Sequence, residues 1–274
     1  MLTKDQLQVP MVREMFDLAR RIVKGERQPG WIEPETIQSA EYRKRVAAIL
    51  KKHGLLESSG GPAFFNLIRF VPNPRVGEAL CDIALDEVRH GRMLLECLDP
   101  LGEEYRDAFR NIFTEPSSDA RLRQVGMRQG RRDPESWADV LAFTMLIDPA
   151  GILIVGARLF SNYGPLSRAS ARTLLDEEGH AAFWEKWGQD LLASPEGRRE
   201  VQDAVDRILP TALGTLGRPK AVNPEFAREQ ALGIWRDDPL VLQDALREML
   251  KLSVEPAGLV IRKDTQPNYS VAFW

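Results

Sequence analysis

Hydrophobic residues recur at intervals of three and four along most of the chain, which is the spacing of one buried face on an α-helix. This pattern predicts helices over residues 11–23, 42–56, 76–98, 137–160, 166–192, 201–216, 224–235 and 239–252. At several predicted helix starts a capping side chain stands directly before a proline, which suits the first turn. These pairs are Asn73-Pro74, Asp133-Pro134, Ser194-Pro195 and Asn223-Pro224. The pattern therefore predicts an all-α fold.

Short segments rich in Gly and Pro join the predicted helices, and no long linker or low-complexity tract separates them. We therefore expect a single domain over residues 1–274, with a bundle core at about 38–217 and C-terminal helices and tail at about 222–274. The segment Ser58-Ser59-Gly60-Gly61 favours the end of a helix. The residues from Gly258 onward read as extended, which predicts a short strand-like tail or hairpin packed on the helices.

Composition limits the classes of function without adding a motif. The 37 basic and 40 acidic residues are mixed along the chain, and the one basic cluster, residues 121–132, has no interleaved aromatic residues. We interpret this cluster as a solvated helix face in preference to a binding site for an acidic partner, and we expect no nucleic-acid partner. No apolar run reaches the roughly 18 residues of a membrane helix, so we expect no membrane span. The first residues carry an acid and lack an apolar stretch, so we expect no signal peptide. Because the only cysteines are Cys81 and Cys97, we expect reduced thiols and a cytoplasmic location.

Two of the three histidines follow a glutamate by three positions. The motifs are Glu87-Val88-Arg89-His90 and Glu177-Glu178-Gly179-His180. On a helix such residues lie on one face about one turn apart, so their side chains can bind the same cation. One motif alone is more often a surface ion pair, but both lie in apolar helices, where an unpaired Glu or His would be costly. The pair therefore indicates a metal site.

Two further acids precede the motifs at nearly equal distances. Glu57 precedes Glu87 by 30 residues, and Asp148 precedes Glu177 by 29. A four-helix bundle that joins two Glu-x-x-His turns and one carboxylate from each of two other helices forms a di-iron or di-manganese site. Asp148 lies in a strongly apolar run, which favours a ligand role, whereas Glu57 is equally consistent with a surface acid. Carboxylate and imidazole ligands favour iron over zinc.

Other residues near the motifs have weaker assignments. Each ligating imidazole needs an acceptor for its second nitrogen, and the adjacent acids Asp86 and Asp176 are candidates, while Glu178 is at least as consistent with a surface acid. Several apolar residues near the expected ligands are more often plain core than substrate contacts. They are Phe64, Phe65, Phe143, Met145, Phe183 and Trp184.

The two motifs and Asp148 occur together with further matching segments over roughly residues 40 to 260, namely 41–44, 163–165, 203–207 and 210–213. In these residues the chain resembles the ferritin-like oxygenases of bacterial phenylacetate catabolism, the family of the catalytic component of phenylacetyl-CoA epoxidase. The resemblance implies a ferritin-like four-helix bundle with additional helices and a di-iron centre. Carried over by position, the implied iron ligands are Glu57, Glu87, His90, Asp148, Glu177 and His180.

The resemblance also implies a reaction. Members of this family use two iron ions and O2 to insert one oxygen atom into an organic substrate, the aromatic ring of a CoA thioester. They take electrons from an external reductase and pair with a related, catalytically silent subunit, so a reductase and such a subunit or a homodimer are expected partners. Because this chain has the full set of ligands, it resembles the catalytic subunit.

The chain departs from the family in two places that bear on the site. Pro149 follows Asp148 directly, and we expect a kink or bulge there because proline disfavours α geometry at the preceding residue. Residues 80–85 contain no Lys or Arg that could bind CoA phosphates. A free acid, an amino acid or a carrier-bound intermediate therefore stays open as substrate.

Three other functions stay open from the sequence. The first is a ferritin-like protein that oxidises or stores iron. The second is a non-catalytic scaffold subunit of an oxygenase complex with a vestigial site. The third keeps the di-iron chemistry but performs hydroxylation, desaturation or N-oxygenation in place of epoxidation.

Overall fold

The computed structural model of the chain describes residues 8–114, 134–180 and 182–269. Within these ranges the chain is helical and contains no strand, apart from one isolated bridge between Ile32 and Tyr163. The prediction of an all-α, ferritin-like bundle is confirmed. The basic cluster at 121–132 and the predicted cap Asp133 lie outside the described residues.

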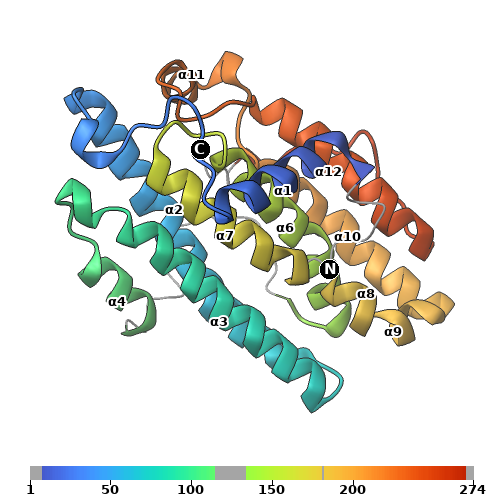
Figure 1. Cartoon of the computed structure of the whole chain (residues 1–274). Helices are drawn as coiled ribbons and strands as arrows, with labels where there is room; N and C mark the ends of the chain where they lie inside the picture. The colour runs from blue at the N-terminus through green and yellow to red at the C-terminus, as the bar shows by residue number, and fades with distance from the viewer. Residues whose placement is uncertain (1–7, 115–133, 181, 270–274) are drawn as a thin grey trace.

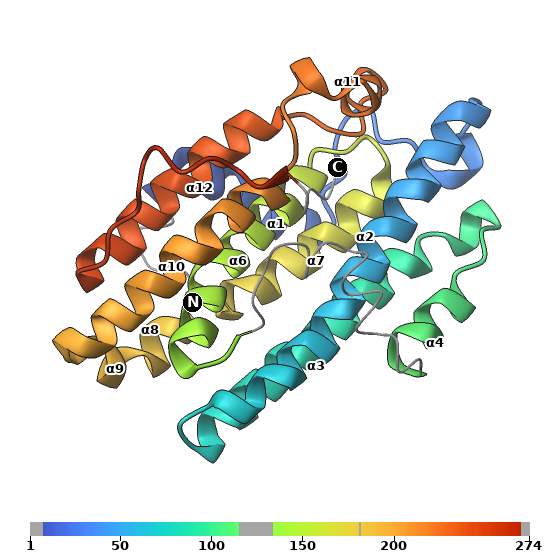
Figure 2. The same ribbon diagram turned by 180° about the vertical axis from the view of Figure 1, so that it is seen from behind.

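Four long helices form the centre of the molecule. They are α2 (Ala40–Leu67), α3 (Pro74–Glu96), α6 (Trp137–Arg158) and α7 (Gly164–His180). Helix α2 packs along α3, α6 packs along α7, and α3 contacts α7 across the bundle. Figures 1 and 2 show these helices side by side from opposite directions. Each predicted iron ligand therefore lies on one of the four helices.

Additional helices cover the α6–α7 half of the bundle. Helix α1 (Pro10–Val23) packs on α7 and α6, while α10 (Pro195–Thr215) and α12 (Pro239–Val254) pack on α6. Among the described residues α6 alone is long and apolar enough to cross a membrane, but 89% of its apolar window is buried inside the protein. This burial is typical of the central helix of a bundle.

The remaining helices are short. Helix α4 (Arg106–Thr114) packs on α2, and α11 (Pro224–Ala231) precedes α12. The predicted helix over 166–192 is divided, because α7 ends at His180 and α8 (Phe183–Trp187) and α9 (Gln189–Ala193) follow it. The apolar pattern continues across this division since Phe183 and Trp184 stay buried.

Three of the predicted caps are confirmed. The side chains of Asn73, Ser194 and Asn223 accept hydrogen bonds from backbone N–H groups in the first turns of α3, α10 and α11. A proline occupies the first turn of each of these helices. Local sequence signals therefore set where these helices begin.

The predicted end of a helix at residues 58–61 is wrong, because α2 continues to Leu67. The reason lies in the neighbouring helix. A Cβ atom on Gly61 would lie 2.4 Å from Val88 Cγ2, and one on Gly91 would lie 2.0 Å from Ser58 Oγ. Small residues on both helices therefore allow a close approach of α2 and α3, and this packing outweighs the low helix propensity of glycine.

Helix α6 continues through Pro149 to Arg158, so the expected disturbance does not end or split the helix. The helix is held on several sides by α7, α10 and α12. Nearly all of its residues are buried, and this tertiary packing compensates for the hydrogen bond that proline cannot donate.

Of the two predicted forms of the tail, the hairpin is not formed over its described part, residues 258–269, and the tail packs on the helices without a strand. Side chains take the place of a partner strand. Gln202 of α10 bonds both the N–H and the C=O of Val260, and Arg247 of α12 donates to the carbonyl oxygen of Thr265. Leu259 and Ile261 are buried against the helices, so the tail closes this side of the core without a sheet.

Candidate metal centre

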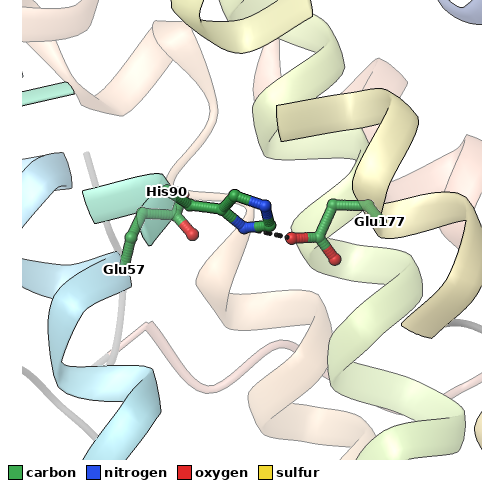
Figure 3. A group of neighbouring side chains, drawn as sticks. All are labelled: Glu57, His90 and Glu177. Atoms are coloured by element: carbon green, nitrogen blue, oxygen red, sulfur yellow. Dashed lines mark ion pairs between the residues drawn. The ribbon is translucent and has the colours of Figure 1, made fainter. Parts of the chain in front are cut away.

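Helices α3 and α7 bring the two Glu-x-x-His motifs face to face. The ring centroids of His90 and His180 are 5.9 Å apart. The two carboxylate oxygens of Glu177 lie 3.1 Å from His90 Nδ1 and 3.2 Å from His180 Nδ1. Figure 3 shows Glu177 pointing at the His90 ring from the opposite helix. One buried carboxylate thus serves both imidazoles.

The outer nitrogens of the imidazoles meet aspartates from the opposite motif. His90 Nε2 lies 3.3 Å from Asp176 Oδ2, and His180 Nε2 lies 3.3 Å from Asp86 Oδ2. The contacts therefore cross between α3 and α7. A carboxylate at Nε2 fixes the tautomer and directs Nδ1 toward the cluster, which is how metal-binding histidines are usually oriented.

Two groups of side chains could each hold a metal ion. In the first, Glu57, His90 and Glu177 offer ligand atoms that all lie within 4.8 Å of one another. Glu87, Glu177 and His180 form the second group by the same measure. Figure 3 shows Glu57 and Glu177 on either side of His90, arriving from α2 and α7. Because Glu177 belongs to both groups, the arrangement fits a pair of ions with a shared carboxylate.

Asp148 adds a fourth carboxylate from α6. It is 7% exposed, and with Glu57, Glu87 and Glu177 it lines one cavity. Its Oδ2 atom is buried and has no hydrogen-bond partner. Burial, supplemented by the negative charge of Glu177, raises the pKa of Asp148 well above its usual value. A buried carboxylate of this kind needs a proton or a cation.

The histidine pKa values show the strength of the surrounding negative charge. Burial alone would lower the pKa of His90, but hydrogen bonds to Asp176 and Glu177 outweigh it and raise the pKa to about 10. Burial likewise opposes protonation of His180, yet Glu177 and Asp86 raise its pKa to about 12. The cluster therefore favours positive charge between its carboxylates.

The pKa values of the two motif glutamates are shifted in opposite directions. Burial raises the pKa of Glu87 well above its usual value, and the charges of Glu177 and Glu57 add to the effect. Burial would also raise the pKa of Glu177, but the two histidines lower it. These shifts are typical of buried carboxylates that compete for too few cations.

This donor set fits the two-iron cofactor that the sequence resemblance implies. It consists of four carboxylates and two imidazoles without a thiolate, and it leaves Asp148 Oδ2 unsatisfied. Oxygen and nitrogen ligands in a helix bundle suit redox-active iron or manganese better than structural zinc.

Comparison with known proteins decides the family. Residues 11–270 match the family model described as phenylacetic acid catabolic protein. The chain belongs to this family. It is 26% identical over 231 residues to the A component of the 1,2-phenylacetyl-CoA epoxidase of Escherichia coli strain K12, and the match covers 84% of this chain and 72% of that protein. Membership of the phenylacetic acid catabolic family supports an oxidoreductase of the oxygenase type at the level of the family.

The cavity of this family member measures about 100 Å³ and lies between α2, α3, α6 and α7. Of the apolar residues that the sequence singled out, Phe64 and Phe143 line it, with their rings edge to face at 5.8 Å. Met145, Phe183 and Trp184 are buried elsewhere in the core, and Phe65 is 45% exposed.

Arg158 is a cavity residue that the sequence reasoning missed. It stands at the end of α6, is 1% exposed, and places Nη2 at 2.5 Å from Glu57 Oε1. A signal was available, because Arg158 lies within a long apolar run, where a buried cation needs a partner. That partner lies on α2, however, so the sequence order alone does not reveal it.

Proposed function

We propose that this chain is the iron-binding subunit of an oxygenase that holds two iron ions and inserts one oxygen atom of O2 into an organic substrate. The observation that carries the proposal is the crossed arrangement of the two motifs. Four carboxylates converge on two imidazoles whose outer nitrogens are already occupied by Asp86 and Asp176. The ligands would be Glu57, Glu87, His90, Asp148, Glu177 and His180.

The chain's own residues would bind the iron ions, orient the imidazole rings and shield the cavity from water. Asp86 and Asp176 hold the imidazole rings so that Nδ1 faces the carboxylates. When bound, the iron ions supply the electrons and open coordination positions that O2 activation requires. The apolar side chains of Phe64, Phe143 and Ile147 line the cavity and limit the entry of water.

The name of the relative supplies candidates for the substrate and the partners. Because that relative is one component of a phenylacetyl-CoA epoxidase, an aromatic acyl-CoA is one candidate substrate, with epoxidation or hydroxylation as the reaction. The cavity of about 100 Å³ would receive the reactive end of such a molecule. A partner subunit, an external reductase and a cytoplasmic location stay predictions.

The test is metal quantification with Mössbauer spectroscopy after anaerobic loading with iron. Wild type should bind two irons per chain and show a coupled di-iron signal. Glu87→Ala and His180→Ala should each lose that signal, because each removes a ligand from a different motif. Glu178→Ala changes an acid on the same turn of α7 and serves as the matched control.

Other outcomes would favour the competing functions. Retention of the coupled signal in Glu87→Ala or His180→Ala would contradict a shared site. Fewer than one iron per wild-type chain would favour a scaffold subunit. Stoichiometric oxidation of iron without any organic product, when reductase and substrates are supplied, would favour iron storage over oxygenation.

A further inference from the structure

The guanidinium of Arg158 is buried with most of its hydrogen-bond donors unused. Glu57 accepts one bond from Nη2, while Nε and Nη1 have no partner. A buried charged donor without an acceptor is costly, so an absent acceptor is expected beside it. The buried side chain of His53 does not supply negative charge, because burial and the charge of Arg158 lower its pKa well below the usual value.

Arg158 also marks one end of the cavity. Arg158 contacts Glu57, whereas Phe143, earlier on α6, contacts Phe64, later on α2. The two helices therefore run in opposite directions along the cavity, with a charged end and an aromatic end. Both ends and the carboxylates of Glu87, Asp148 and Glu177 line the same space.

Charge balance indicates what the cavity would accept. With two divalent ions and neutral imidazoles, the four carboxylates of the proposed site are neutralised. Among the residues that line the cavity the charge of Arg158 then remains, in a place that is 1% exposed to solvent. Asp86 and Asp176 contact the imidazoles and do not line the cavity. One anionic group would balance it, and arginine binds carboxylates through short, charge-assisted hydrogen bonds.

We propose that Arg158 is the anchor for the carboxylate of a short organic acid, whose apolar body extends toward Phe64 and Phe143. The carbon chain of this acid would then pass the cluster of Glu87, Asp148 and Glu177. This inference names the substrate class of the proposed oxygenase site and rests on that function for its chemistry, but binding of the acid is measured separately. It favours a free acid over a thioester, because the acyl carbonyl of a thioester lacks the negative charge of a carboxylate.

The experiment is anaerobic calorimetry of the iron-loaded protein with matched acids and amides: butyrate and butyramide, hexanoate and hexanamide, benzoate and benzamide. At least one acid should bind ten times or more tightly than its amide. Arg158→Gln should abolish the preference, and Arg158→Lys should retain part of it. Arg168→Gln, which removes an arginine–glutamate pair outside the cavity, should leave the preference unchanged.

Equal binding of every acid and its amide by wild type, or binding of none of them, would overturn the inference. So would an undiminished preference in Arg158→Gln, because the acid would then be held by iron alone. If Arg158→Gln does not fold, wild type and Arg158→Lys still decide the question. The iron content per chain is read in the same samples, so a failure of the proposed di-iron function is seen independently of a failure of acid binding.

Discussion

Asp86 and Asp176 do not lie beside the histidines of their own motifs. Each contacts the imidazole that the opposite helix supplies, at 3.3 Å. Asp86 is also held by Arg89, 2.5 Å away, and its pKa is lowered chiefly by its hydrogen bond to His180. The aspartate therefore stays negative and remains an acceptor for the ring across the bundle.

Replacement of either aspartate should weaken metal binding. Asp86→Asn or Asp176→Asn removes the negative acceptor that orients an imidazole, and we expect metal affinity to fall roughly 10- to 100-fold. Competition with a chelator of known affinity measures the change. Glu178→Gln is the control, and an equal loss in that variant would show that the effect is general charge and not orientation.

The histidine pKa values predict a pH dependence for the metal-free protein. Since the folded-state pKa values of His90 and His180 are raised to about 10 and about 12, their stabilising contribution is complete below the unfolded value near 6.5. It is lost as the pH rises toward 10. Between pH 6.5 and 9.5 we expect the Tm of chelator-treated protein to fall by at least about 3 °C.

Bound metal should remove this loss of stability at high pH. Ligation requires neutral imidazoles, so the iron-loaded protein should lose no stability over the same pH range, as thermal unfolding under anaerobic conditions would show. A Tm of metal-free protein that rises with pH would contradict the assigned charge state of the histidines.

At the scale of residues, the sequence was sufficient to predict which candidate ligands share one helix turn. The i, i+3 spacing of Glu87 and His90 placed both on one face of α3, and their clustering with Glu177 and His180 follows from two such faces in one bundle. Arg158 and its contact with Glu57 could not be predicted, because the pair joins α6 to α2 and has no spacing along the chain.

At the scale of helices, the close packing of α2 against α3 depends on glycine and serine residues at their interface. A Cβ atom on Gly60 would lie 2.6 Å from Glu87 Oε2, and one on Gly54 would lie 2.6 Å from Leu95 Cγ. The same sequence feature that indicates flexibility in an isolated helix therefore permits close packing here. Single-helix propensity could not predict this, since it depends on what the neighbouring helix presents.

Gly91→Ala tests this close approach. The added methyl group would lie 2.4 Å from the Ser58 backbone nitrogen and 2.5 Å from the Gly54 carbonyl oxygen, which cannot rotate away. We expect a loss of roughly 1–3 kcal/mol in the free energy of unfolding, measured with urea. Gly179→Ala is the control, because a Cβ atom there meets nothing within 4 Å and should be neutral or slightly stabilising.

At the scale of the whole molecule, α6 joins the bundle to the C-terminal helices. Its residues contact α7 on one side and α10 and α12 on others. The helix order and the buried apolar run of α6 were predictable from periodicity. The tail was not, because its backbone groups are bonded by Gln202 and Arg247, two side chains far away in the sequence.

This shared core predicts that the chain unfolds as one unit. Separate unfolding of the C-terminal helices would expose the apolar side of α6, so we expect one calorimetric transition with equal calorimetric and van't Hoff enthalpies for the metal-free protein. Two resolved transitions would contradict the single domain that the sequence predicts. Addition of iron should raise the transition temperature with increasing metal concentration, because only the folded chain forms the site.

The crossed aspartate–histidine contacts also bear on how such a site can diverge. Each helix hairpin supplies ligands to both groups of the centre, and each supplies the aspartate that contacts the histidine of the other hairpin. Neither hairpin can therefore lose its site residues without an effect on the other, because the loss of Asp86 disturbs His180 and the loss of Asp176 disturbs His90. Selection on one metal position acts on both halves of the gene together, and a descendant that abandons the centre is expected to lose both motifs rather than keep one of them intact.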